Sequence, residues 1–233
     1  MSTTTLEDFF VRFRESEGES ADRLATFFRD FDADFHKARI IRATSTPHLD
    51  VLRVFGLEFA ELRHSAALAW FLSSRAEHEQ GSLFVNALLE LFKPDIKTSD
   101  RYTVQREQHE RTDVAVFARG EFAVFVENKV RHSEREMQVA DMVKSLAKVS
   151  TELEIPREHR FALFLTDTGV KPVTGPDEDS KGFSKGNLKS ISRVELFEHF
   201  RSALTAQSIH SPLLLAFIES YLNSIRRIRA QLS

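Results

Sequence analysis

A carboxylate, an amide and an ammonium group follow one another at the end of an apolar run. The segment FAVFVENKV covers residues 122–130, and its polar members are Glu127, Asn128 and Lys129. An unpaired charge in a core strand costs stability, so this strand end indicates either an ion pair or a chemical site. Glu127 and Lys129 are two residues apart, which places them on one face of a strand.

A second carboxylate, Asp113, stands in the preceding apolar run. If residues 118–120 form a three-residue hairpin loop, Gly120 supplies the left-handed conformation that such loops need. Asp113 and Glu127 then become diagonal neighbours on one sheet face, with Cβ atoms within roughly 7–8 Å. Two carboxylates at that spacing can share a cation. A two-residue turn would put them on opposite faces. If the two carboxylates share a cation, the loop is therefore predicted to have three residues.

Divalent metal chemistry follows from this pair. Two neighbouring carboxylates in a partly dry site repel each other and resist ionisation. A bound Mg²⁺ or Mn²⁺ would remove that penalty, because such ions take oxygen ligands, and the backbone carbonyl of Asn128 could add one. Lys129 beside the cation could orient or deprotonate a water, or stabilise charge on a phosphate.

Apolar periodicity predicts the elements that position these residues. A helical N-terminal extension is expected over residues 1–50, and residues 169–187 are typical of a loop. The order of the elements indicates one α/β core. Helices are predicted at 57–74, 81–92, 133–149, 193–205 and 211–230, and strands at 102–108, 112–118, 121–129 and 160–167.

Composition sets limits on the function. The 233 residues are 42% hydrophobic and 29% charged, as in an ordinary globular protein, and contain no Cys. Disulfides and Cys-based zinc sites are therefore excluded. The formal net charge of −3 argues against a protein that binds nucleic acid by charge alone. The chain start lacks a signal-peptide pattern, so a cytoplasmic protein is expected.

A wider pattern surrounds the strand-end residues. Its members are Glu61, His64-Ser65, the apolar stretch 68–72, His78, Gly81, Glu107, Arg111-Thr112-Asp113, Glu127-Asn128-Lys129 and Gln138. This pattern resembles a bacterial family of the PD-(D/E)xK nuclease superfamily, and the resemblance covers roughly residues 50–230. Its departures are Glu110, where a Gly is common, and Met142, where a Tyr is common.

The resemblance implies a fold and a domain organisation. It implies an α/β restriction-endonuclease-like core in which helices flank a central mixed β-sheet. Residues 1–233 would form a single nuclease-like domain, with residues 51–233 as the core and the C-terminal helices.

The resemblance also implies roles for individual residues. The metal ligands would be Asp113, Glu127 and Asn128. Lys129 would be the catalytic base or charge stabiliser, and Glu61 a catalytic carboxylate on the first core helix. Candidates for contacting the substrate or supporting the site are Gln138, Arg111, Glu107, His64 and Ser65.

Plainer interpretations stand beside these roles. Glu127 and Lys129 could form an ion pair and nothing more, although this leaves the upstream pattern unexplained. Glu61 could be a solvated helix residue, and Glu107 an ordinary exposed strand residue. His64 and Ser65 could simply cap or pack the helix start.

The predicted function is that of a metal-dependent nuclease that uses Mg²⁺ or Mn²⁺. The expected partner is nucleic acid, with DNA favoured over RNA. By analogy, the setting would be bacterial defence against phage, as a homodimer or within a larger defence complex. One alternative is a catalytically inactive nuclease-fold module that binds nucleic acid or regulates, and a second is an RNA-directed nuclease.

Overall fold

A computed structural model describes residues 50–108, 112–130, 137–172, 182–207 and 211–232. The predicted N-terminal extension lies, except for Asp50, outside the described residues. The chain from Asp50 to Ser233 forms one compact unit. No helix in the described ranges is long and apolar enough to cross a membrane.

A mixed five-stranded sheet forms the centre of this unit, in the order β1-β2-β3-β4-β5. The β1–β2 and β2–β3 pairs are antiparallel, and the β3–β4 and β4–β5 pairs are parallel. This sheet confirms the predicted mixed architecture. The strands are β1 (Thr103–Gln108), β2 (Thr112–Ala118), β3 (Phe122–Asn128), β4 (Arg160–Thr166) and β5 (Leu188–Ser192).

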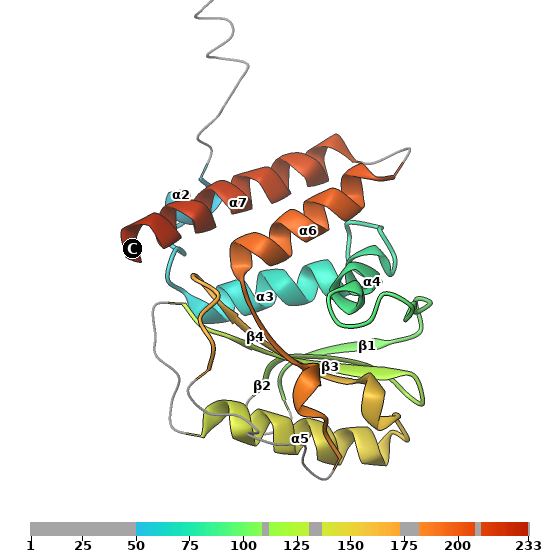
Figure 1. Cartoon of the computed structure of the whole chain (residues 1–233). Helices are drawn as coiled ribbons and strands as arrows, with labels where there is room; N and C mark the ends of the chain where they lie inside the picture. The colour runs from blue at the N-terminus through green and yellow to red at the C-terminus, as the bar shows by residue number, and fades with distance from the viewer. Residues whose placement is uncertain (1–49, 109–111, 131–136, 173–181, 208–210, 233) are drawn as a thin grey trace, which may run out of the picture. The chain divides into compact units, whose positions relative to one another are not determined.

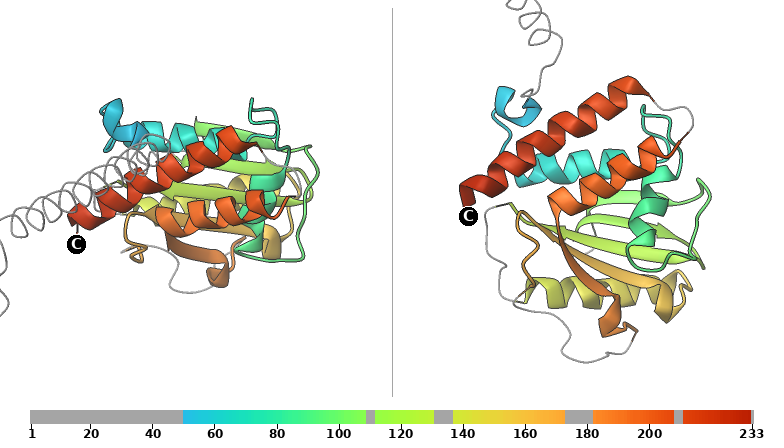
Figure 2. Two further views of the ribbon diagram at one scale, coloured as in Figure 1. Left: turned by 90° about the horizontal axis from the view of Figure 1, so that it is seen from above. Right: turned by 45° about the horizontal axis from the view of Figure 1, so that its top comes forward.

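Helices cover both faces of the sheet (Figures 1 and 2). Below the sheet in Figure 1 lies α5 (Gln138–Glu152), and above it lie α3 and α4, with α6 and α7 stacked outside them. The bounds of the upper helices are α2 (Val51–Val54), α3 (Glu61–Leu72), α4 (Leu83–Glu90), α6 (Arg193–Thr205) and α7 (Pro212–Leu232), and two short 3₁₀ turns are η1 (Arg157–His159) and η2 (Lys185–Asn187).

The alternation of strand residues gives each layer its own apolar core. Val114, Val124 and Leu163 belong to the cluster that packs against the upper helices. Ala115 and Phe125 belong to the cluster on the α5 side. Since successive strand residues point to opposite faces, odd-numbered residues of β2 and β3 face α5.

The β2–β3 hairpin differs from the prediction by one residue. Ala118 pairs with Phe122, so the three-residue loop is 119–121 rather than 118–120, with Gly120 at φ +70° in its centre. Ala118 and Phe122 are both buried, and pairing them keeps both apolar side chains in the core. The loop length is as predicted, so the two strand-end carboxylates keep a common face.

The sequence pattern missed β5. Residues 188–192 read LKSIS, and only Ser192 is buried, so no apolar run announces a strand. The strand forms because β4 offers a parallel edge from Ala162 to Thr166. It leads directly into α6, whose first turn is closed by a capping box between Ser192 and Glu195. The strand therefore fixes where α6 begins.

Candidate active site

The strand-end carboxylates meet where the sheet changes from antiparallel to parallel pairing. Val114 pairs with Val126, so one residue further along Asp113 lies opposite Glu127. Opposite Cβ atoms are about 4.5–5.5 Å apart, closer than the predicted diagonal arrangement. Both side chains face α5 and are buried, Asp113 at 9% and Glu127 at 1% exposure.

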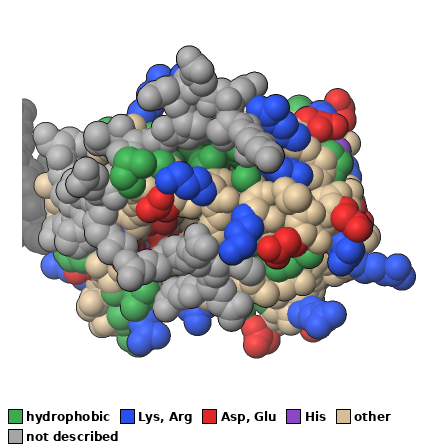
Figure 3. Space-filling model, turned by 90° about the horizontal axis from the view of Figure 1, so that it is seen from below, with side chains coloured by type: hydrophobic (Ala, Val, Ile, Leu, Met, Phe, Trp, Pro, Cys, Tyr) green, Lys and Arg blue, Asp and Glu red, His purple; other side chains and the backbone are tan. Residues whose placement is uncertain are grey.

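Hydrogen bonds hold each carboxylate in place. The backbone N–H of Asn128 donates to Asp113 Oδ2 at 2.7 Å. The side-chain amide of Gln138, the first residue of α5, donates to Glu127 Oε1. The resemblance placed Gln138 beside the site, and the structure brings it there. Seen from below, acidic side chains lie in a hollow on the left side of the molecule (Figure 3).

Lys129 connects this pair to the first turn of α3. Its Nζ atom is 2.8 Å from Glu127 Oε1 and 3.0 Å from Glu61 Oε1. The second oxygen of Glu61 accepts from the backbone N–H of Val130 at 3.4 Å. The structure thus places the Glu61 carboxylate, 25% exposed, at the site, and its catalytic role stays a prediction.

Burial and mutual repulsion make the carboxylates hard to ionise. Burial raises the pKa of Asp113, with partial relief from the Asn128 N–H. Burial, and next the charge of Asp113, raise the pKa of Glu127 to about 8. Burial works to lower the pKa of Lys129, but its hydrogen bonds and attraction to Glu127 and Glu61 outweigh this and raise it. Lys129 is therefore cationic at neutral pH.

These shifts predict a pH-dependent stability of the metal-free protein. Folded Glu127 keeps its proton to about pH 8, whereas the unfolded side chain releases it near 4.5. The folded state binds more protons in that window, so stability is present below it and is lost as pH rises through it. Each tenfold difference in proton affinity is worth about 1.4 kcal/mol, and Asp113 adds a change of the same sign.

Urea unfolding in EDTA, from about pH 5 to about pH 8, measures this effect. We expect Glu127→Gln, which stays neutral, to flatten the decline and to be more stable than the wild type at the upper end. The matched control is Glu152→Gln on the exposed face of α5, which should leave the decline intact. Parallel profiles for wild type and Glu127→Gln would contradict the prediction.

A buried polar network supports the site from the opposite sheet face. The Asn128 amide donates to Ser65 Oγ at 3.0 Å, and Asn128 Oδ1 accepts from Arg193 at 3.0 Å. Arg193 also pairs with Asp167. The Asn128 side chain is thereby occupied, so a metal contact through its backbone carbonyl is what stays predicted.

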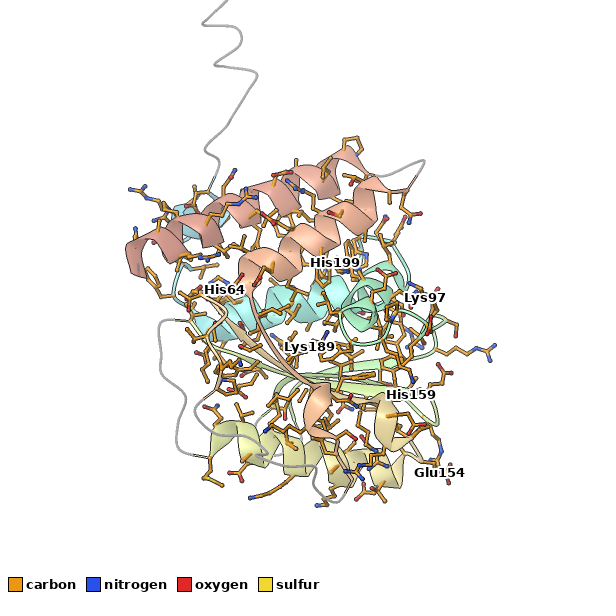
Figure 4. All side chains as sticks on the ribbon, viewed as in Figure 1. His64, Lys97, Glu154, His159, Lys189 and His199 are labelled. Atoms are coloured by element: carbon orange, nitrogen blue, oxygen red, sulfur yellow. The ribbon has the colours of Figure 1, made fainter. Side chains whose placement is uncertain are left out.

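His64 lies beside this network, at the end of α3 nearest the site (Figure 4). Its Nε2 donates to the Glu58 carbonyl at 3.0 Å, and its Nδ1 accepts from the Tyr221 hydroxyl at 2.6 Å. Burial, and next the charge of Arg193, lower the pKa of His64 to about 4. His64 is therefore neutral, and its two hydrogen bonds connect α3 to α7 and to the chain before α3. It supports the site from the sheet face opposite the carboxylates.

The structure does not describe the side chains of two candidate residues, Glu107 and Arg111. Glu107 belongs to β1, but its side chain lies outside the described atoms. Arg111 lies outside the described residues. Their roles stay predictions.

Arg193 and Asp167 are site-supporting residues that the sequence interpretation missed. Asp167 directly follows the apolar strand β4, much as Glu127 and Asn128 close the apolar strand β3, and this repeated pattern was a signal. Arg193 gave no comparable signal, because the first residue of a helix is commonly charged and solvated.

The donor set fits a divalent cation. In the described ranges no three Asp, Glu or His side chains already converge as a metal centre. Asp113 and Glu127 nevertheless offer adjacent carboxylate oxygens, which Mg²⁺ and Mn²⁺ prefer. A cation would remove the repulsion that now raises their pKa values.

Comparison with known families shows which family the chain belongs to. A sequence model described as the PD-(D/E)XK nuclease superfamily matches residues 49–223. The chain belongs to the PD-(D/E)XK nuclease superfamily. This confirms the resemblance seen in the sequence. No curated protein and no solved structure matches the chain.

Membership gives the spatial cluster a context. PD-(D/E)XK proteins are typically nucleases that use divalent metal ions, so nucleic acid is the substrate class that the family indicates. The assignment of Asp113 and Glu127-Asn128-Lys129 to the superfamily's pattern rests on the resemblance seen in the sequence and stays a prediction. The match begins just before the first described residue and ends in α7, so it spans the sheet and both helical layers.

Proposed function

We propose that the chain is a divalent-metal-dependent nuclease that hydrolyses phosphodiester bonds, with DNA ahead of RNA as its substrate. The observation that carries this proposal is the buried Asp113–Glu127 pair with Lys129 at 2.8 Å from Glu127. A purely structural ion pair would not need a second buried carboxylate beside it. Bacterial defence against phage DNA is the setting we propose, by analogy with the family.

In the proposed reaction, the oxygen of water bonds to phosphorus as one P–O bond to the nucleic acid breaks, and a proton from the water ends on the departing oxygen. Mg²⁺ or Mn²⁺, held by Asp113, Glu127 and the Asn128 carbonyl, would supply charge neutralisation and a water of lowered pKa. Cationic Lys129 lies beside these ligands and stabilises the negative charge that develops on the phosphate oxygens. Glu61 positions Lys129 through its 3.0 Å contact.

Asp113→Asn tests the ligand assignment. The amide keeps an oxygen for the Asn128 N–H but removes one of the two negative charges. Because cation affinity depends on ligand charge, we expect Mn²⁺ to bind roughly tenfold more weakly or worse in a calorimetric titration. Asp95→Asn, an exposed change between α4 and β1, is the control. Unchanged Mn²⁺ affinity in Asp113→Asn would refute its role as a ligand.

The activity itself is tested on plasmid, linear duplex, single-stranded DNA and structured RNA. Each substrate is incubated with Mg²⁺, Mn²⁺ or EDTA, beside the Asp113→Ala/Lys129→Ala double variant. We expect metal-dependent cleavage that the double variant loses. Cleavage confined to RNA would replace DNA as the substrate. Binding to nucleic acid without cleavage under any metal would favour the inactive binding module.

A further inference from the structure

A second candidate site lies at the far end of α3 from the carboxylates. A cavity of about 610 Å³ opens between the C-terminal part of α3 and the start of α7, walled by Trp70, Leu214 and Phe217. Binding pockets for drug-sized groups commonly measure about 300–1,000 Å³. Trp70 follows Glu61 by nine residues of α3, a rise of about 13.5 Å along the helix, so this cavity is separate from Glu61 and the active site.

Hydrogen bonds hold the aromatic wall rigid. The Trp70 indole N–H donates to Glu77 at 2.8 Å. His78 Nε2 lies 3.1 Å from both the Trp70 and the Phe71 carbonyl oxygens, and His78 Nδ1 accepts from the Gln80 N–H at 3.0 Å. The Trp70 ring meets the His78 ring edge-on, with centroids 4.9 Å apart. A preformed wall lowers the entropic cost of binding.

One exposed apolar side chain and two carboxylates lie together at the rim of the cavity. Leu213 is 81% exposed, and Glu77 and Glu79 are exposed beside it. Hydrogen bonds from its own backbone and from Trp70 lower the pKa of Glu77, which keeps it charged. Glu79 has φ +56°, a strained conformation for a residue with a side chain, and such strain is concentrated at functional sites.

The negative charge at the rim indicates which kind of ligand the cavity can bind. No Lys or Arg is among the described residues that line the cavity. Ser211, just before α7, also lines it, but the positive end of a helix carries only about half a unit charge, less than two carboxylates. Nucleic acid phosphates are repelled here. Cationic groups are attracted, both by the carboxylates and by the face of Trp70.

We propose that the Trp70 cavity binds a segment of a partner protein that inserts a large apolar side chain flanked by Lys or Arg. The apolar side chain enters the cavity against Trp70, Leu214 and Phe217 and covers Leu213. The cations lie against Glu77 and Glu79. Interfaces commonly concentrate their binding energy in such a buried anchor with a polar surround. This site is independent of the proposed nuclease activity.

A peptide-display selection on the full chain tests the proposal. A random peptide library is selected on the wild type and, in parallel, on Leu213→Asp and on the control Val54→Asp, an exposed apolar residue of α2. We expect enriched sequences with a large apolar residue next to Lys or Arg, bound by wild type and Val54→Asp and lost by Leu213→Asp. Enrichment of acidic sequences, or binding insensitive to Leu213→Asp, would overturn the proposal.

Trp70 is the only tryptophan of the chain, so its fluorescence reports the cavity directly. The selected peptide should shift Trp70 emission saturably, and Glu77→Gln/Glu79→Gln should weaken its binding by roughly tenfold, since two close charge contacts are lost. Emission of the free chain that resists acrylamide quenching would show the cavity already filled by the chain itself. Self-association abolished by Leu213→Asp would make a second copy the occupant. Either result would overturn the proposal, whatever the nuclease assays show.

Discussion

Lys129→Met is expected to lower the cleavage rate by roughly a hundred- to a thousandfold while divalent-metal binding persists. Met keeps much of the length of Lys but carries no charge, so the variant loses the cation that faces the developing phosphate charge. Removal of one preorganised stabilising group typically has an effect of this size. The proposed ligands Asp113 and Glu127 are unchanged in this variant, so calorimetric titration with Mn²⁺ should still show binding.

Lys129→Arg separates two possible roles of this residue. Arginine stays protonated in proteins, so it can stabilise charge but cannot act as a base. The raised pKa of Lys129 leads us to expect partial activity in Lys129→Arg, clearly above Lys129→Met. The control is Lys97→Met, since Lys97 lies at the far side of the molecule from His64 (Figure 4). Wild-type cleavage by Lys129→Met would remove Lys129 from the reaction.

Arg193→Leu is expected to destabilise the fold by about 3–5 kcal/mol. Arg193 is 1% exposed, and burial lowers its pKa to about 10. It pairs with Asp167 and donates to Asn128 at 3.0 Å. Its removal leaves the Asp167 carboxylate buried without its cation, and an uncompensated buried charge is costly.

Urea unfolding compares Arg193→Leu with Arg226→Leu. Arg226 forms a surface ion pair with Glu198 at 2.8 Å, and such pairs contribute about 0–1 kcal/mol. We expect Arg193→Leu/Asp167→Leu to recover much of the lost stability, because the double change removes both buried charges. A small loss in Arg193→Leu, similar to Arg226→Leu, would show that the network carries little of the stability.

Local patterns in the sequence were enough to predict most of the helices and strands. The strand predicted at 112–118 and the helix predicted at 193–205 coincide with β2 and α6, because apolar spacing is decided by neighbours along the chain. The number of residues in the β2–β3 loop was also predictable, since a three-residue loop brings Asp113 and Glu127 to one sheet face and a two-residue loop does not. The one-residue shift was not, because it depends on burying Ala118 and Phe122 together.

Contacts between distant residues explain what the sequence could not give. Glu61 reaches Lys129 across 68 positions, and residue chemistry alone could not separate that contact from a solvated carboxylate. The family resemblance pointed to Glu61 because a family pattern carries three-dimensional information, and the contact with Lys129 agrees with that position, while the role of Glu61 stays a prediction. Arg193 reaches Asn128 across 65 positions and had no such help. β5 likewise depends on the edge of β4 rather than on its own apolar content.

The change from antiparallel to parallel pairing at β3 has a consequence for how the chain folds. The β2–β3 hairpin closes a loop of three residues, whereas β4 must cross over through α5 before it can pair. Longer closures form later because their entropic cost comes first. We therefore expect Asp113 and Glu127 to be brought together before β4 and α6 deliver Asp167 and Arg193. During that interval Lys129, which follows Glu127 on the same chain segment, is already available to the acidic pair, whereas the Arg193–Asn128 contact behind it is still missing. A proton or a cation from solution would neutralise the second carboxylate.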